Sequence, residues 1–146
     1  LFGTEDDPDQ AQPTLHNALS LINLEKNNFL CIKDENKVIA WSVVLPTSIK
    51  NMTSFLSNRM TEKDLFLDSI NNPKFESLYL MSVIVLPEYR KKGLGSKLLT
   101  QQINYFKNNF SINNFYAMIL SNEGSKLLEK LIEDLKIKIS FVNKLN

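Results

Sequence analysis

Two uncharged apolar segments on either side of an amphipathic segment constrain the fold of this chain most strongly. The segments "SLYLMSVIVL" (residues 77–86) and "FYAMILS" (115–121) have the length of strands and no clean polar alternation, which is typical of strands covered on both faces. Between them, apolar residues recur at helical spacing from Gly95 to about Asn109. Strand, helix and strand in this order predict two parallel neighbouring strands with a right-handed connection.

The rest of the chain predicts further elements of one mixed α/β domain, α+β in character. We expect a central mixed sheet of about five or six strands flanked by helices. The other expected elements are a helix over 14–26, a hairpin over 29–46, helices within 50–72, a helix over 123–135 and a final strand over 137–142.

Five single residues refine these expectations. Pro46 should end the second run of the hairpin, and Thr61 with Asp64 resembles a capping box that begins a helix. Cys31 lies in an apolar run, where a buried structural thiol is the usual outcome. His16 falls in the first predicted helix, where a surface or packing position is expected. Neither residue supports covalent catalysis.

Length and composition bound the class of protein. A chain of 146 residues with 43% hydrophobic and 23% charged residues is typical of one globular, soluble domain. No apolar run reaches the roughly 18 residues of a membrane helix, and the N-terminus lacks the layout of a signal peptide. A single cysteine excludes an internal disulfide and, with a single histidine, disfavours a zinc site. We expect a cytoplasmic monomer or homodimer that binds no metal and no membrane.

The charge of the chain is small but unevenly distributed. A net charge of +1 argues against a dedicated nucleic-acid-binding protein. Residues 1–12 contain four acidic residues and no Lys or Arg, which predicts an acidic N-terminal tail. The folded domain is then expected over 13–146.

The turn after the strand 77–86 combines several features of a phosphate-binding site. Arg90, Lys91 and Lys92 precede Gly93 and Gly95, where the next helix begins. A helix N-terminus has unpaired N–H groups and a partial positive charge, and glycine lets a ligand approach the backbone closely. The combination suits a pyrophosphate, and Gly95→Val should then abolish binding with only a small loss of stability.

Other phosphate-binding motifs fit this turn poorly. The spacing of a Walker A loop is absent, and the third glycine of a dinucleotide fingerprint is replaced by Leu98. The acidic residue expected about 20 positions further on in that fingerprint is also missing. A plain strand-to-helix turn with surface cations remains the structural alternative.

The stretch "VIVLPEYRKKGLGSKLL" (83–99) resembles motif A of the GNAT superfamily, the acyl-CoA-dependent N-acyltransferases. "VLP" matches the end of the family's strand and "RKKGLG" its phosphate-binding signature. The resemblance implies a single-domain GNAT-like fold with a helical insert at about 47–76, and allows residues 1–12 to be a truncated first strand. It implies acetyl-CoA as co-substrate, with the pantetheine arm along Val83, Ile84 and Val85 and the phosphates on Arg90, Lys91, Lys92, Gly93, Leu94, Gly95 and Ser96.

The stretch "MILSNEGSKLLEKL" (118–131) resembles motif B of the same family. The resemblance implies that Asn122 contacts the pantetheine arm. Alternatively, Ser121 or Asn122 caps the helix that follows, and the two interpretations are compatible. The family often places a tyrosine acid in this helix, but Leu128 or Glu129 occupies that position here. 

The resemblance implies that an amine attacks the thioester of acetyl-CoA in a ternary complex. A backbone N–H of residues 83–85 is the natural oxyanion donor. Tyr79 and Glu76 are the candidate bases, although Glu76 also fits an exposed carboxylate. The alternatives are a base that acts through water, or no base at all, since an amine can lose its proton before it binds. Tyr116 and Tyr105 are candidates to replace the missing tyrosine acid.

The sequence therefore predicts a GNAT-type N-acetyltransferase that uses acetyl-CoA and an amine acceptor, without nucleic acid. The missing tyrosine and the lack of an obvious strand in residues 1–10 favour an alternative. That alternative is a catalytically degenerate acyl-CoA-binding module with a regulatory or structural role. The insert at 47–76 and the first helix should border the acceptor side of the cleft.

Overall fold

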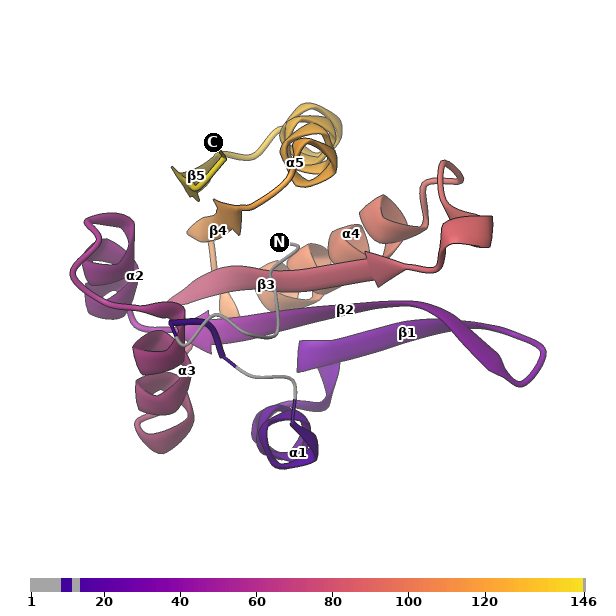
Figure 1. Cartoon of the computed structure of the whole chain (residues 1–146). Coiled ribbons are helices and arrows are strands. Elements are labelled where there is room, and N and C mark those ends of the chain that lie inside the picture. The colour runs from indigo at the N-terminus through magenta and orange to yellow at the C-terminus, as the bar shows by residue number, and fades with distance from the viewer. Residues whose placement is uncertain (1–8, 12–13, 146) are drawn as a thin grey trace.

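The computed structural model describes residues 9–11 and 14–145, which form a five-stranded mixed sheet with helices on both faces (Figure 1). The strands lie in the order β1-β2-β3-β4-β5. β1, β2 and β3 pair antiparallel, whereas β3, β4 and β5 pair parallel. Their bounds are β1 (Phe29–Asp34), β2 (Lys37–Thr47), β3 (Ser77–Val85), β4 (Phe115–Ile119) and β5 (Ile139–Asn143). The predicted mixed sheet is confirmed.

The helices form two layers around this sheet. One face carries α4 (Leu94–Phe110) and α5 (Asn122–Leu135), and the other carries α1 (Leu15–Leu24), α2 (Ile49–Leu56) and α3 (Glu62–Asn71). Two short 3-10 helices are η1 (Lys26–Asn28) and η2 (Pro87–Tyr89). None of the helices in the described ranges is long and apolar enough to cross a membrane.

Side-chain caps begin α1, α2 and α3, and the cap that the sequence predicts at Thr61 is confirmed. Thr61 caps α3, because its hydroxyl accepts the backbone N–H of Asp64 at 3.1 Å. Thr14 caps α1 and Ser48 caps α2 in the same way. Each cap provides an acceptor for one N–H group that has no partner within the helix.

The predicted β3–α4–β4 crossover is confirmed, and it produces the feature that positions the site. Leu99, Ile103 and Phe106 of α4 are fully buried against the sheet. β3 and β4 pair only from Leu78 opposite Phe115 to Leu80 opposite Ala117. Beyond these pairs the two strands diverge, so residues 81–85 of β3 have no partner strand on the β4 side among the described residues.

A β-bulge in β3 lies where β4 diverges. Val44 of β2 pairs with Leu80, but its neighbour Val43 pairs with Ser82, so Met81 is the extra residue. An extra residue shifts the alternation of the side chains. Val83 consequently shares the α4 face with Leu80 and is buried in the same core.

Two sequence expectations are wrong. Pro46 does not end the strand, because β2 continues to Thr47. The N–H of Glu76 donates to the carbonyl of Thr47, so the backbone of Thr47 faces β3 and that of its neighbour Pro46 faces the opposite side. β1 does not extend as far as Pro46 on that side, so no strand needs the N–H group that proline lacks. Cys31 is exposed rather than buried, because β1 is an edge strand whose alternate residues face solvent. His16 is exposed on α1, as expected.

The acidic N-terminal segment falls mainly on residues 1–8 and 12, which lie outside the described residues. Its described part contacts the start of α3. The backbone N–H of Lys63 donates to the carbonyl of Asp9 at 2.9 Å, and the N–H of Ala11 donates to Glu62 Oε1 at 3.0 Å. Residues 9–11 therefore border the same side of the sheet as the helical insert.

Candidate functional site

The turn between β3 and α4 presents the N-terminus of α4 without a capping side chain. Gly93 is the N-cap residue, and its φ of +75° places it in the left-handed region. Lys91 is also left-handed, with a φ of 63°. The first backbone bond of the helix runs from the N–H of Lys97 to the carbonyl of Gly93 at 3.0 Å. The N–H groups of the first turn thus have no side-chain acceptor, which is the arrangement that binds anions.

The two glycines of this turn have different roles. At Gly93 the constraint is the positive φ, which strains residues that have a side chain. Space is not the constraint there, because a Cβ would meet only Lys130 Nζ, at 3.8 Å. A Cβ on Gly95 would lie 3.2 Å from Val83 Cγ2 and 3.7 Å from Leu127 Cδ2. Gly95 therefore lets α4 pack closely on β3 and α5. A side chain at Gly95 would therefore contact the core, and its effect on ligand binding stays a prediction.

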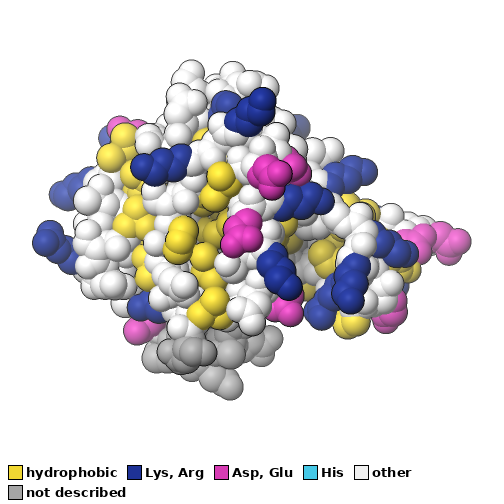
Figure 2. All heavy atoms as spheres, turned by 90° about the horizontal axis from the view of Figure 1, so that it is seen from above, with side chains coloured by type: hydrophobic (Ala, Val, Ile, Leu, Met, Phe, Trp, Pro, Cys, Tyr) yellow, Lys and Arg dark blue, Asp and Glu magenta, His cyan; other side chains and the backbone are white. Residues whose placement is uncertain are grey.

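The three cations of the turn are exposed, and two of them contact neutral groups of the protein. Arg90 Nε donates to the carbonyl of Val85 at 2.9 Å. Lys92 Nζ lies 5.5 Å from the ring centroid of Tyr89. Lys and Arg side chains gather at this end of the molecule, on the right of Figure 2. Both contacts position the cations without neutralising their charge.

The hairpin turn between β1 and β2 anchors this loop. The Tyr89 hydroxyl donates to Asp34 Oδ2 at 2.7 Å, across 55 positions of the sequence. This hydrogen bond raises the pKa of Tyr89 above its ordinary value. Asp34 therefore fixes the ring on which Lys92 lies.

The backbone of β3 offers hydrogen-bonding groups where the two strands diverge. The N–H of Leu86 donates to the carbonyl of Ile39 in β2 at 2.9 Å. Because successive residues of a strand point their backbone groups to opposite sides, Val85 and Val83 face away from β2 and Ile84 faces toward it. The sequence treated these three residues alike, but only Val83 and Val85 direct backbone groups toward the gap.

The start of α5 shows which residue of the second motif caps the helix. Ser121 caps the helix, since its hydroxyl accepts the N–H of Gly124 at 3.0 Å. Asn122 is the first helical residue, and its side chain is exposed. Of the two positions at which the family's tyrosine would fall, Leu128 is buried and Glu129 is exposed.

Tyr79 and Tyr116 are fully buried, side by side on the face of the sheet that carries α1, α2 and α3. Their ring centroids lie 5.1 Å apart. The hydroxyl of Tyr79 donates to Glu62 Oε2 at 2.6 Å, and the hydroxyl of Tyr116 lies 2.6 Å from Thr47 Oγ1. Burial raises the pKa of both tyrosines, and the Glu62 carboxylate raises that of Tyr79 further. Both hydroxyls therefore stay protonated at neutral pH.

The other two predicted candidates lie in different surroundings. Glu76 is exposed, and its Oε1 accepts the backbone N–H of Ile49 at 3.1 Å, at the start of α2. Tyr105 lies on α4, where its hydroxyl donates to Glu25 Oε1 at 3.2 Å. The structure therefore brings Tyr79 and Tyr116 together, and places Glu76 and Tyr105 in separate contacts.

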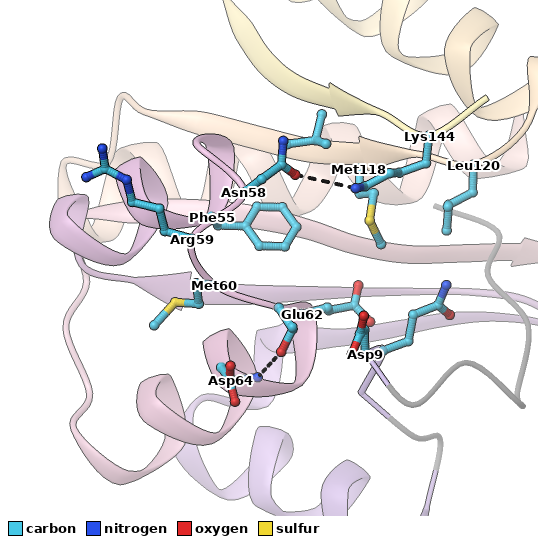
Figure 3. A pocket seen from close by; sticks show the side chains of 13 residues that line it. Asp9, Phe55, Asn58, Arg59, Met60, Glu62, Asp64, Met118, Leu120 and Lys144 are labelled. Atoms are coloured by element: carbon cyan, nitrogen blue, oxygen red, sulfur yellow. Dashed lines mark hydrogen bonds between the residues drawn. The ribbon is translucent and has the colours of Figure 1, made fainter. Parts of the chain in front are cut away.

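A cavity of about 560 Å³ opens beside α3 (Figure 3). It lies between the α2–α3 connection, the ends of β4 and β5, and residues 9–10. The lining residues are Asp9, Gln10, Phe55, Asn58, Arg59, Met60, Thr61, Glu62, Asp64, Met118, Leu120, Val142 and Lys144. We call this space the α3 cavity.

The sequence predicts an acceptor side near the insert but does not single out Glu62. Glu62 is buried, with 9% of its surface exposed, and it lines the α3 cavity. In the sequence it is an acidic residue in the first turn of a helix, where the helix dipole already explains it. Its contact with Tyr79 depends on the fold, so no local pattern could have identified it.

Two comparisons with known proteins bear on this geometry. The family model "Acetyltransferase (GNAT) family" matches residues 2–130. No curated protein sequence matches the chain. A solved structure described as "GphF GNAT-like decarboxylase in complex with isobutyryl-CoA" is similar, with 15% identity and a TM-score of 0.53 over 75% of this chain. The match covers 53% of that protein, so the chain spans about half of its length, and the likeness shows the fold alone.

Proposed function

The chain belongs to the acetyltransferase (GNAT) family, and from this premise we propose that it transfers an acetyl group from acetyl-CoA to an amine. The observation that supports this best is the uncapped N-terminus of α4, which lies beside the unpaired edge of β3. A pyrophosphate and an extended amide-containing arm need these two features side by side. The CoA complex of the structurally similar decarboxylase is consistent with this use of the fold.

In the proposed complex, the turn between β3 and α4 holds the pyrophosphate of acetyl-CoA. The backbone N–H groups of the first helical turn donate to the phosphate oxygens, and the exposed cations add positive charge. The pantetheine amides bind the backbone of Val83 and Val85, and the Asn122 side chain contacts the arm from α5. The phosphate-binding residues are Arg90, Lys91, Lys92, Gly93, Leu94, Gly95 and Ser96.

The reaction needs little side-chain chemistry in this arrangement. An ammonium loses one proton to water, and the lone pair of the resulting amine attacks the thioester carbon. A C–N bond forms and the C–S bond breaks, while the second amine proton passes through solvent to the CoA thiolate. The products are an N-acetyl amine, CoA thiol and one released proton. The backbone N–H of Val83 is the proposed oxyanion donor.

We assign structural roles to the two buried tyrosines. Tyr79 as a base must ionise, but burial raises its pKa, and Tyr116 as an acid must reach the thiolate, but its side chain is fully buried. Both hydroxyls are also held by protein groups, Glu62 and Thr47. In the proposed reaction, solvent rather than either tyrosine therefore carries the protons.

Release of CoA thiol from acetyl-CoA, measured with a panel of amines, tests the function. The expected result is amine-dependent thiol release together with a product heavier by one acetyl group. A second candidate is the catalytically degenerate acyl-CoA-binding module, which is favoured by Leu128 and Glu129 at the position of the family's tyrosine. That candidate predicts a rise in melting temperature with acetyl-CoA and no N-acetyl product from any amine.

A further inference from the structure

We propose that Asp34, the last residue of β1, is a positioning residue that holds the turn between β3 and α4 in its binding conformation through the hydroxyl of Tyr89. This inference rests on the proposed function and names a residue that controls the affinity of the same site for CoA. Asp34 lies 55 positions from Tyr89 and outside both stretches that resemble the family motifs. Neither residue contacts the ligand in this proposal, so each acts through the shape of the turn.

The turn between β3 and α4 is tied to the sheet at its ends, and its middle is tied to the β1–β2 hairpin at the same end of the molecule (Figure 1). At its start, the N–H of Leu86 donates to the carbonyl of Ile39, and at its end α4 begins at Leu94. Within the described part of the chain, Asp34 accepts the only hydrogen bond between residues 87–92 and a segment other than this turn and β3. The Asp34 contact is therefore the restraint on the middle of the turn.

The turn needs such a restraint, because its own sequence disfavours the conformation that it adopts. Lys91 has a φ of 63°, which is strained for a residue with a side chain. The consecutive cations Arg90, Lys91 and Lys92 also repel one another. A strained backbone persists where the surrounding contacts hold it in place. Without the bond to Asp34, we expect the turn to spend part of its time in other conformations.

The contacts of Tyr89 carry the restraint from Asp34 to a cation of the turn. The Tyr89 hydroxyl donates to Asp34 Oδ2 at 2.7 Å, a short distance that is typical of a bond to a carboxylate. Lys92 Nζ lies 5.5 Å from the centroid of the same ring. Because one ring joins the carboxylate to Lys92, a movement of the ring moves the cation. A carboxylate by itself repels phosphate, so the proposed benefit comes from the hydrogen bond and not from the charge.

The size of the effect follows from the population of the binding conformation. A ligand binds more weakly in proportion to the fraction of the protein that is not in the competent conformation. A turn that is competent about one fifth of the time would therefore raise the Kd for CoA about five-fold. The turn would bind phosphates and not the thioester, so kcat should stay unchanged.

Calorimetric titration with CoA tests the role of Asp34 through a set of matched variants. Tyr89→Phe keeps the ring and removes the hydroxyl, and it should raise the Kd for CoA about five-fold. Asp34→Ala should produce a similar loss, whereas Asp34→Asn keeps an acceptor and should stay within about two-fold of the wild type. Because the two residues act through one bond, the double variant Asp34→Ala/Tyr89→Phe should also lose about five-fold and not about twenty-five-fold.

Steady-state kinetics separates positioning from a purely structural role. The KM for acetyl-CoA should rise with the Kd while kcat stays within about two-fold, and the unliganded variants should melt within about 2 °C of the wild type. A bond that only stabilised the fold would change the melting temperature and leave the KM alone. Glu35→Gln, at an exposed carboxylate next to Asp34, is the matched control and should change none of these quantities.

Four outcomes would overturn the proposal. They are an unchanged Kd in Tyr89→Phe, equal losses in Asp34→Asn and Asp34→Ala, a double variant about twenty-five-fold weaker than the wild type, and a fall of kcat at constant KM. If CoA does not bind the wild type, the proposed function fails and this inference fails with it. If CoA binds but no amine is acetylated, only acetyl transfer fails, and the Kd values still decide the role of Asp34. If amines are acetylated and Tyr89→Phe keeps its affinity for CoA, only the role of Asp34 fails.

Discussion

The turn that would bind CoA and the α3 cavity are built in opposite ways. The turn consists of consecutive residues from Leu86 to Ser96, and its cations point to solvent. The α3 cavity is assembled from segments that are distant in the sequence. The buried hydrogen bonds behind it also link distant residues: Tyr79 and Glu62 are 17 positions apart, and Thr47 and Tyr116 are 69 positions apart. A site made of consecutive residues can be recognised from a short motif, whereas a site assembled by the fold cannot.

The two regions also place their charges differently. Arg90 and Lys92 contact a carbonyl and an aromatic ring, so their charge stays available to a ligand in solvent. Glu62 is buried, and it accepts hydrogen bonds from the Tyr79 hydroxyl and the Ala11 N–H. Substitution of the cations in the turn between β3 and α4 should therefore change the affinity for CoA. Substitution of the buried Tyr79 or Glu62 should change the stability of the fold as well. Gly95 is the exception, since it lies in the turn but packs against the core.

Gly95→Val should produce the largest effect and shows where the turn becomes part of the core. A Cβ would lie 3.2 Å from Val83 Cγ2, so the variant should lose about 1–3 kcal/mol of unfolding free energy through overpacking. Gly93→Ala is the control, with a cost of about 1 kcal/mol from its positive φ alone. Denaturant unfolding of both variants measures the difference. Equal losses would contradict the separate roles given to the two glycines.

The double variant Arg90→Ala/Lys92→Ala tests whether the exposed cations act on affinity alone. Their charges should attract the CoA phosphates equally in the ground state and the transition state. The KM for acetyl-CoA should rise about ten-fold, corresponding to about 1.4 kcal/mol, while kcat stays within a few-fold. Lys107→Ala, in the last turn of the same helix, is the control and should change neither. A collapse of kcat at constant KM would give the cations another role.

Tyr79→Phe should have a smaller effect, and it tests whether the Tyr79 hydroxyl has only a structural role. The substitution removes one of the neutral donors to Glu62 but keeps the aromatic ring. We expect a loss of about 1 kcal/mol of unfolding free energy and a kcat within a few-fold of wild type. A loss of kcat of more than a hundred-fold in a folded variant would assign the hydroxyl to catalysis.

The pH dependence of stability should show the smallest effect. Burial raises the folded-state pKa of Tyr116 above 10.0, its ordinary value. The folded state therefore holds this proton more tightly, and the stability contribution is complete below about pH 10 and is lost as the pH rises toward the folded-state pKa. Between about pH 10 and 12, the stability of the Tyr116→Phe variant should accordingly fall less than that of the wild type. Parallel curves for the two proteins would show that Tyr116 is not the group that titrates.

The elements that the sequence predicted well are those with local signals. Leu99, Ile103 and Phe106 recur at helical spacing, and they are the residues that α4 buries. The capping box at Thr61 likewise lies within four consecutive residues. Such patterns depend only on neighbours in the chain, which is why they survive in the fold.

The failures concern residues whose environment is set by distant partners. Cys31 looked buried because its neighbours are apolar, but its strand lies at the edge of the sheet. Pro46 remains inside a strand because β1 ends before it. Glu62 became a candidate only through its contact with Tyr79. The environments of all three residues depend on the strand order and on contacts between layers, and neither follows from a local sequence pattern.

The central claim is that the N-terminus of α4 binds the phosphates of CoA, and a matched ligand pair tests it most directly. The measurement is the melting temperature of the wild-type protein with acetyl-CoA and, at the same concentration, with S-acetylpantetheine, which lacks the pyrophosphate and nucleotide. At a hundred times its Kd, acetyl-CoA should stabilise the protein by about 2.7 kcal/mol. S-acetylpantetheine should produce little or no shift. Equal shifts with both ligands, or no shift with either, would contradict the account.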